Sequence, residues 1–226
     1  MAEAELFEQA RRSTQWHYQW AIVEDFLPRV AGEEIVGSVR REGPRFYTPR
    51  RAIRTSRSSS PTPPIAYLFD LPGAAPAQRS KRIDGTLPPV LIALPEAVTG
   101  QVDVAAFHSL AARDLQRGQA LGLPAGEDVS RAMGEEPLSP DEVALGEALS
   151  GPTPLWLYVM REAYVRFDGN RLGPVGGRIV AEVLLGIVDA DPASYRSVDP
   201  SWRPTLPAVQ NGPFGLADFL LFSARA

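Results

Sequence analysis

The sequence predicts an all-α fold. Apolar residues recur every three or four positions over several long segments, and no stretch alternates apolar and polar residues as a half-buried strand does. The clearest such segment covers residues 3–30, with apolar or small side chains at Leu6, Ala10, Ser13, Trp16, Trp20, Val23 and Leu27. A helix-start signal is the second observation, because Ser139 precedes a proline and two acidic residues. With 226 residues, 44% of them hydrophobic, the chain can bury a sizeable core in one large domain or two small ones.

Each helix can be justified in turn. The first is expected to end at Pro28, and Glu33–Arg41 can add a short helical piece. Gly134 can end one later helix, and Pro174 can open another. The helices expected after residue 95 cover residues 104–119, 126–133, 139–149, 153–166, 173–188 and 216–222.

Residues 44–95 differ from the segments on either side, because many of the chain's 22 prolines lie there and residues 50–64 (RRAIRTSRSSSPTPP) have no hydrophobic periodicity. Proline breaks helices, so a partly disordered Pro/Arg/Ser-rich linker is expected. Its arginines would suit a nucleic-acid or acidic-membrane tether, but without interleaved aromatic residues a solvated segment is favoured. The expected divisions are therefore an N-terminal helical segment (1–43), the linker (44–95) and a C-terminal helical part (96–226).

Composition excludes several function classes. The net charge of −4 gives no reason to expect a nucleic-acid partner. The absence of Cys excludes disulfides, thiolate metal sites and Cys nucleophiles, and two histidines cannot make a site of three imidazoles. No apolar run approaches about 18 residues, and the acidic N-terminus is unlike a signal peptide. A cytoplasmic protein without a membrane partner is expected.

The common catalytic motifs (nucleophile elbow, zinc helix, P-loop and dinucleotide fingerprint) are absent. Glycines at 169–177 precede a helix and could bind an anion, but close helix packing is the favoured interpretation. His17 has no second metal ligand at helical spacing, so a packed, hydrogen-bonded histidine is favoured. One histidine suffices to bind haem iron, so His108 could do so in principle, but its position alone gives little support for that role.

Asp114 falls on the apolar side of its expected helix, with Arg117 one turn further on. A carboxylate there needs a partner, and an Asp–Arg pair three residues apart supplies one. Alternatively, the carboxylate orients another group, such as an imidazole N–H. Spacing leaves both interpretations open.

Several segments together resemble the animal-type haem peroxidases, and in particular the bacterial branch of that superfamily. They occur in the order found there: TQWHYQWAIVEDFLPRVAG at 14–32, LAARDLQRGQALGLPAG at 110–126, TPLWLYVMREA at 153–163, GNRLGPVGGRIVAEVLLG at 169–186 and DPASYRSVDPSWRP at 191–204. The resemblance implies an incomplete form of that helical fold, with haem as its cofactor and hydrogen peroxide and an organic reductant as its substrates. It covers the C-terminal part of the family pattern only.

The resemblance assigns three residues around the haem. Asp114 aligns with the residue that accepts the proximal imidazole's hydrogen bond, Arg117 with an arginine close to a haem propionate, and Leu110 with a pocket-lining position. Ala125 and Glu127 depart from the family's loop pattern, and neither His17 nor His108 matches a family ligand position. The family's distal His/Arg segment and its proximal-His helix are not found in this chain, so no catalytic or metal-binding residue carries over. Truncation together with an internal deletion or frameshift is the expected origin.

Three hypotheses about function follow. The first is a haem peroxidase family protein that is truncated and impaired as a lone chain, because haem without a proximal ligand is held only by contacts and propionate pairing. The second is a non-catalytic pseudoenzyme, a helical remnant whose exposed apolar faces bind a protein partner. The third is complementation, in which a neighbouring polypeptide completes the fold and supplies the histidines.

Overall fold

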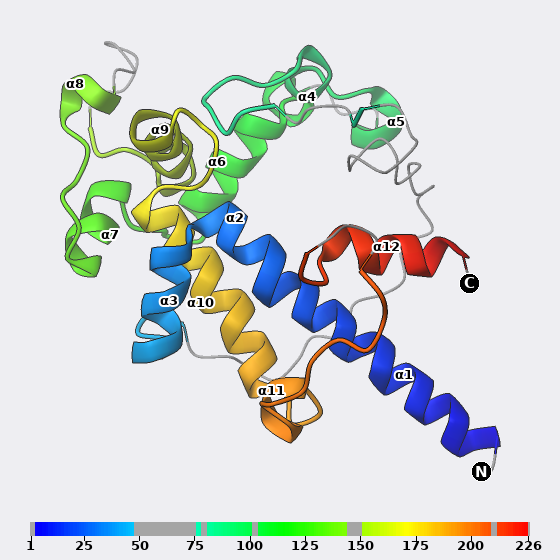
Figure 1. Cartoon of the computed structure of the whole chain (residues 1–226). Coiled ribbons are helices and arrows are strands. Elements are labelled where there is room, and N and C mark those ends of the chain that lie inside the picture. Colours follow the sequence, from blue (N-terminus) through cyan, green and yellow to red (C-terminus); the bar gives the residue numbers. More distant parts are fainter. Residues whose placement is uncertain are drawn as a thin grey trace. The chain divides into compact units, whose positions relative to one another are not determined.

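The computed structural model describes residues 3–47, 76–77, 81–100, 104–143, 151–208 and 212–225. Within these ranges the secondary structure is helical and contains no strand; the one β-type contact is an isolated bridge between Ala125 and Pro154. The expected all-α class is confirmed. The chain forms two compact units, Met1–Lys81 with Arg178–Ala226 and Arg82–Gly177 (Figure 1).

The first unit begins with a nearly continuous helical rod, formed by α1 (Glu3–Trp20), the π-helical turn η1 (Ala21–Phe26) and α2 (Leu27–Ala31). The other elements of this unit are α3 (Glu33–Glu42), the part of α10 (Pro174–Ala190) from Arg178 onward, α11 (Tyr195–Val198) and α12 (Leu216–Arg225). The short helix expected near residues 33–41 is confirmed as α3. The α11 helix was not expected from the sequence.

Pro28 does not end the first helix, contrary to the sequence expectation. Proline lacks an N–H, and its ring clashes with the carbonyl four residues earlier in a regular α-helix. Here the preceding turn is a π-helix in which the Leu27 N–H bonds to the Ile22 carbonyl, so the proline enters a turn that is already widened. The helix instead ends at Gly32, whose φ of 93° lies in the region that favours glycine.

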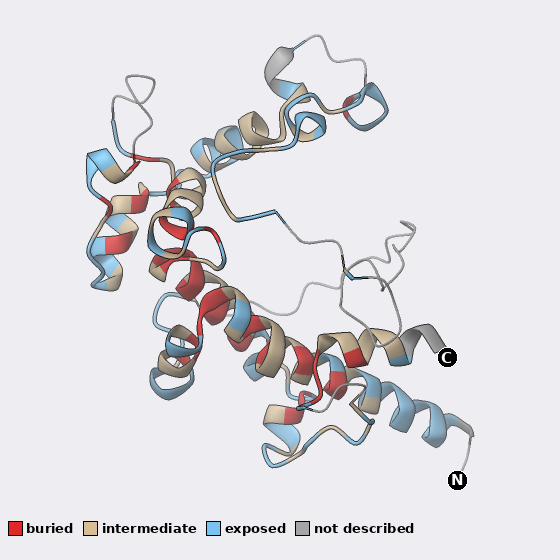
Figure 2. Ribbon diagram, turned by 45° about the horizontal axis from the view of Figure 1, so that its top comes forward, coloured by how far each residue is buried: buried red, intermediate tan, exposed pale blue. Residues whose placement is uncertain are grey.

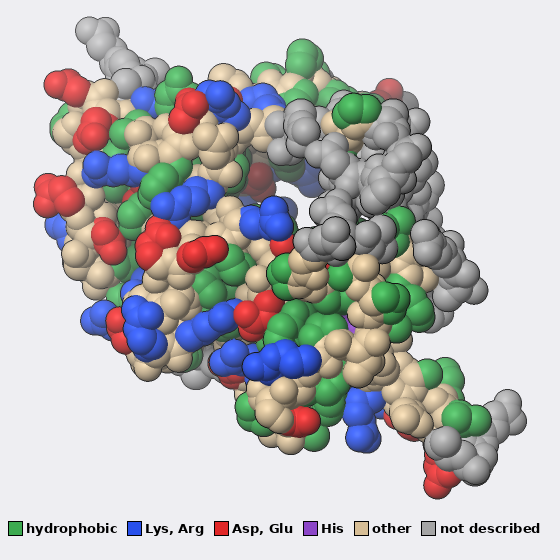
Figure 3. All heavy atoms as spheres, viewed as in Figure 1, with side chains coloured by type: hydrophobic (Ala, Val, Ile, Leu, Met, Phe, Trp, Pro, Cys, Tyr) green, Lys and Arg blue, Asp and Glu red, His purple; other side chains and the backbone are tan. Residues whose placement is uncertain are grey.

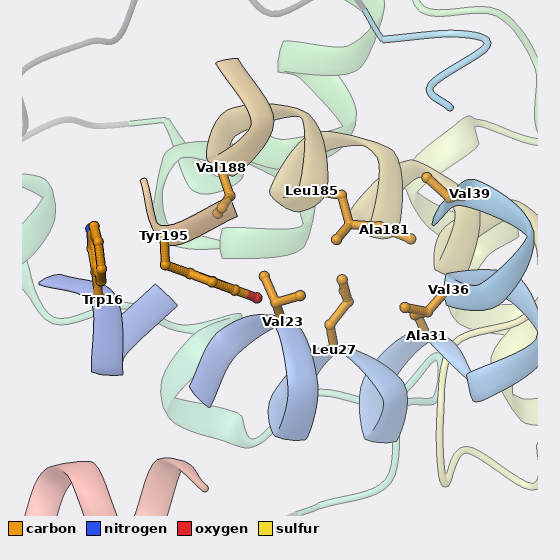
Figure 4. Packing of buried hydrophobic residues seen from close by; sticks show 10 residues of the cluster. All are labelled: Trp16, Val23, Leu27, Ala31, Val36, Val39, Ala181, Leu185, Val188 and Tyr195. Carbon is orange, nitrogen blue, oxygen red and sulfur yellow. The ribbon is translucent and has the colours of Figure 1, made fainter. Parts of the chain in front are cut away.

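The core of the first unit is an apolar cluster between the rod and α10. Figure 4 shows Val23 and Leu27 facing Leu185 and Ala181, with Val36 and Val39 closing one end. Apolar residues recur at helical spacing along the rod and along α10, so each presents one apolar face to the other. Tyr195 from α11 lies at the opposite end of the cluster near Val188, and burial together with the Glu24 carboxylate raises the pKa of Tyr195 to about 12.

The second unit is built around α9. Its elements are α4 (Pro89–Ile92), α5 (Glu96–Thr99), the 3₁₀ turn η3 (Ala105–His108), α6 (Leu110–Ala120), α7 (Gly126–Met133), α8 (Pro140–Val143) and α9 (Leu155–Phe167). Tyr158 of α9 is fully buried, and its hydroxyl accepts a hydrogen bond from the Leu138 backbone N–H at 3.0 Å. α9 thereby holds the segment that leads into α8.

The helix expected over residues 104–119 is interrupted at Ser109. This residue is extended (φ −105°, ψ 122°), and its side chain accepts from the Ala112 N–H, so it caps α6 and separates it from η3. Sequence periodicity did not reveal the break, because a serine is also compatible with a continuing helix.

Two local signals are confirmed. Gly134 ends α7 in the left-handed conformation (φ 79°). Ser139 and Glu142 form a capping box at the start of α8: Ser139 Oγ accepts from the Glu142 N–H at 3.3 Å, and Glu142 Oε2 accepts from the Ser139 N–H at 2.8 Å. The expected continuation of α8 to residue 149 falls on residues 144–150, outside the described ranges.

Most of the expected linker also falls outside the described residues, namely 48–75 and 78–80. The described part departs from an irregular linker at one place, where α4 forms a single turn after Pro88. A proline in the first turn of a helix sacrifices no intrahelical hydrogen bond, so Pro89 is compatible with this turn.

Candidate functional site

A cavity of about 370 Å³ lies within the second unit beside α6 and the start of α9. Its polar lining comprises the Asp114 carboxylate, the amides of Gln116 and Gln119, and Thr153. The rest of its wall is mostly apolar, formed by Leu115, Gly118, Leu123, Pro124, Ala125, Pro152, Pro154, Leu155 and Trp156. Of the described residues that line this cavity, Asp114 is the one with a charged side chain. The cavity therefore combines one negative charge with an apolar surround.

Helix α6 places Asp114 on this wall. The Asp114 side chain keeps 23% of its exposure, and its Oδ1 lies 3.6 Å from Nη1 of Arg117 one turn further along. Arg117 is 68% exposed, so water screens this ion pair and its contribution to folding is small. The Asp–Arg pairing considered from the sequence thus exists, but it is long and superficial.

The opposite wall is a tightly tied pair of loops. The Gly126 N–H donates to the Thr153 carbonyl at 2.9 Å, and the Thr153 hydroxyl donates to Glu127 Oε1 at 2.5 Å. Glu127 Oε2 also accepts from the Thr153 N–H at 3.1 Å. Tyr158 packs directly on Gly126, where an added Cβ would lie 2.0 Å from the ring. These contacts fix the loops before any ligand arrives.

The three site residues expected from the resemblance all lie on α6, but they do not share one site. Of the three, Asp114 lines the cavity. Leu110 is half-buried in the first turn of α6, and Arg117 points to solvent; neither is among the residues that line the cavity.

His17 is a structural histidine, as favoured from the sequence. It is fully buried, and its Nδ1 lies 2.7 Å from the Ser13 carbonyl oxygen, so Nδ1 donates the proton. Its Nε2 then accepts from the backbone N–H groups of Thr205 (3.0 Å) and Leu206 (3.2 Å). The ring also meets Trp202 edge-on at 4.9 Å between centroids. No lone pair of this imidazole is left for a metal.

His108 holds a turn together. It ends η3, its Nδ1 lies 3.1 Å from Thr99 Oγ1, and its carbonyl accepts from the Leu94 N–H at 2.6 Å. These bonds join the segments around α4, α5 and η3. His108 is not among the residues that line the cavity beside Asp114.

The residues present do not fit a haem site. A protein side chain normally binds the haem iron directly. The chain has two histidines; one has both ring nitrogens bonded inside the first unit, and the other lies outside the lining of the Asp114 cavity. No group of three or more His, Cys, Asp or Glu residues that could hold a metal ion occurs in the described part of the chain.

Two buried carboxylates were missed from the sequence. Glu162 on α9 is 2% exposed, and its Oε2 accepts from the N–H groups of Val175 (2.9 Å) and Gly176 (3.4 Å) in the first turn of α10. Burial raises the pKa of Glu162 to about 7, against the opposing effect of these two N–H donors. The available signal was its position: Tyr158, Val159 and Val165, three or four residues away, place Glu162 on an apolar side of α9.

The second buried carboxylate, Glu182, binds two segments of the first unit. Its Oε1 accepts from Arg178 Nε at 2.9 Å, while its Oε2 accepts from the backbone N–H groups of Phe46 (2.7 Å) and Tyr47 (3.0 Å). The guanidinium of Arg178 also lies over the Phe46 ring at 5.5 Å from its centroid. This buried pair fixes the segment after α3 onto α10.

No protein-family model, curated protein or solved structure matches this chain. None of the described helices has both the length and the apolar character needed to cross a bilayer. The cavity beside Asp114 therefore has to be interpreted from its own chemistry. One carboxylate with neutral amides and apolar walls is suited to binding, and the described residues that line the cavity include no second acidic or basic side chain to act as an acid–base partner.

Proposed function

We propose that this chain is a haem peroxidase family protein, whose lineage activity is the haem-dependent oxidation of an organic substrate by hydrogen peroxide. As a lone chain it is impaired, because it supplies no histidine for the iron. The observation that most directly supports this proposal is the environment of Asp114. Its carboxylate lines a mostly apolar cavity, and the resemblance assigns to this residue the acceptor of a proximal imidazole.

Both imidazoles already form hydrogen bonds within the chain, which supports the proposal that the lone chain supplies no histidine for the iron. Removing His17 from its three backbone partners would leave buried polar groups without hydrogen bonds, at a cost of about 1–3 kcal/mol for each. His17 is therefore not free to move to a ligand position. The His108 imidazole is within hydrogen-bond distance of the Thr99 hydroxyl, and His108 precedes α6, the helix that carries Asp114.

Sequencing the genomic locus tests the lineage. An upstream segment with distal His and Arg residues, and a proximal-histidine helix encoded in another frame within the gap between the two matching blocks, are the expected result. A locus without either segment would contradict descent by truncation and deletion. If a neighbouring reading frame encodes both segments, co-purification of its product with this chain would identify complementation.

A second candidate function is a non-catalytic protein that binds a partner through α1. Residues 4–12 of this helix are all exposed, as Figure 2 shows in pale blue, and Phe7 keeps 66% of its exposure. Beside them an apolar groove of about 520 Å³ runs between α1 and α12, lined in part by Phe7, Tyr18 and Phe219. Figure 3 shows hydrophobic and acidic side chains together on this end of α1.

Charge along α1 favours a second copy of the chain as the partner. Acidic residues occupy the first turns, and Arg11 and Arg12 follow them. Two α1 helices packed antiparallel would place the acidic end of each beside the arginines of the other, with the groove residues between them.

Sedimentation velocity over a range of protein concentrations tests this candidate. A concentration-dependent dimer is expected, and it should be lost in Phe7→Ser. The matched control is Val198→Ser, which alters another exposed apolar side chain (52% exposed) of the same unit and should leave the dimer intact. A monomer at every concentration, or equal effects of the two substitutions, would contradict it.

A further inference from the structure

The negative charge in the cavity, on Asp114, is balanced only by a long and exposed ion pair. The ion pair with Arg117 engages Oδ1 at 3.6 Å, and among the described residues Oδ2 has no hydrogen-bond partner. A carboxylate offers about four acceptor positions, so most of its capacity is unused. The amides of Gln116 and Gln119, which share the cavity, carry no charge.

The apolar part of the lining suits a hydrophobic group. Trp156 and Leu155 come from the first turn of α9, while Leu115 and Leu123 come from α6 and the loop after it. A volume of about 370 Å³ is at the small end of the range for ligand sites, which suits a molecule with one aromatic ring. An indole in the wall also attracts cations through its ring face.

The walls are fixed in advance by contacts that do not involve Asp114. The Gly126–Thr153 hydrogen bond and the Thr153–Glu127 hydrogen bonds join the start of α7 to the segment before α9, and the Tyr158 ring packs against Gly126. A ligand therefore has little ordering entropy to overcome when it enters.

We propose that this cavity is a binding site for a small aromatic cation, in which the ammonium or amidinium group of the ligand bonds to the Asp114 carboxylate and its ring lies against Trp156 and the leucines. A carboxylate ligand would be repelled by Asp114. A neutral ring of the same shape would gain the apolar contacts but no charge-assisted hydrogen bond. This inference does not rest on the proposed haem lineage, since no metal or haem takes part in it.

Isothermal titration with benzylamine at pH 7 tests the proposal, with benzyl alcohol as the neutral match and benzoate as the anionic one. Saturable binding of one benzylamine per chain is expected, about tenfold or more tighter than that of benzyl alcohol. Benzoate should not bind. Equal affinities for benzylamine and benzyl alcohol, or no saturable binding of benzylamine, would overturn the proposal.

Three substitutions locate the site. Asp114→Asn should lower the affinity for benzylamine to that for benzyl alcohol, while Asp128→Asn, at another aspartate of the same unit paired with Arg131, should leave it unchanged. Arg117→Gln changes an exposed side chain and removes the competing cation, so it should tighten benzylamine binding by about twofold or more. If Asp114→Asn fails to fold, this third variant decides, and an unchanged affinity in Arg117→Gln would overturn the proposal.

Discussion

Nε2 of His17 lies 3.0 Å from the backbone nitrogen of Thr205 and accepts its hydrogen bond across 188 positions of sequence. Because Nδ1 of the same ring donates to the Ser13 carbonyl, the tautomer is fixed and both nitrogens are used. The imidazole thus joins the C-terminal segment to α1. It is a structural tie, and this excludes it as a metal ligand in the folded chain.

Replacing this ring should therefore reduce stability. His17→Phe keeps the edge-on contact with Trp202 but leaves the N–H groups of Thr205 and Leu206 without an acceptor. The free energy of unfolding is expected to fall by about 2–4 kcal/mol, measured by urea denaturation. Tyr18→Phe, at the exposed neighbouring position, is the control and should change it by less than about 0.5 kcal/mol. A loss in His17→Phe no larger than in the control would contradict the structural role.

Glu162 should make folding stability depend on pH. Its pKa is raised to about 7 from its ordinary value of 4.5, so between these values the folded state binds more protons than the unfolded state. The contribution of the protonated Glu162 carboxyl to the free energy of unfolding is fully present below about pH 4.5 and is lost as the pH rises through 7. Relative to Glu162→Gln, the wild-type free energy of unfolding should fall by on the order of 2 kcal/mol between pH 5 and pH 8.

Urea denaturation at several pH values measures this difference between the two proteins. The groups that face Glu162 are Arg166 and Glu135, together with the N–H donors of Val175 and Gly176. Glu135→Gln serves as the control and should keep most of the pH dependence, because burial is the dominant cause of the raised pKa. Parallel curves for wild type and Glu162→Gln would show that this carboxyl titrates normally.

Gly126 should not tolerate a side chain. A Cβ at this position would lie 2.0 Å from Tyr158 Cγ, so Gly126→Ala must displace α7 or α9. A loss of about 1–3 kcal/mol is expected from the thermal unfolding midpoint and enthalpy. Gly85→Ala, where nothing lies within 4 Å of the added carbon, is the matched control and should be nearly neutral. Similar losses at the two positions would contradict the close packing.

The buried Arg178–Glu182 pair should be sensitive to the loss of one partner. Glu182→Ala leaves two backbone N–H groups, of Phe46 and Tyr47, without an acceptor. It also leaves the buried Arg178 guanidinium with only a 3.7 Å contact to the exposed carboxylate of Glu42. A loss of about 3–5 kcal/mol is expected. The double variant Arg178→Met/Glu182→Ala should recover part of this loss, because it removes the buried charge that has lost its close partner. As a reference, Glu8→Ala in the exposed pair with Arg11 should cost less than about 1 kcal/mol, and a comparable cost at Glu182 would be inconsistent with the buried pair.

Local signals in the sequence were enough to predict most helices. The Ser139 capping box, the left-handed end at Gly134 and the start of α10 at Pro174 all depend on residues within one turn of each other. Position alone also indicated that His17 is packed. The continuation of the first helix through Pro28 could not be predicted, because it depends on a π-turn that apolar periodicity does not reveal.

The cavity could be predicted only in part. The apolar side of α6 indicated Asp114, but the facing wall comes from residues about 40 positions further along, joined by the Gly126–Thr153 bond. Such a pairing between segments distant in sequence has no local signature. The buried partners of Glu162 and Glu182 were missed for the same reason: the N–H groups that they bind belong to other segments of the chain.

A titration of the purified chain with haemin, followed in the Soret band and then by peroxide turnover, tests the central claim most directly. The claim is that this chain by itself supplies no histidine to haem iron. The expected result is a spectrum and a turnover no different from those of haemin with an unrelated protein of similar size. A saturable red shift at one equivalent of haemin, lost in His108→Ala or in His17→Phe, would contradict it and show that a histidine of this chain binds the iron.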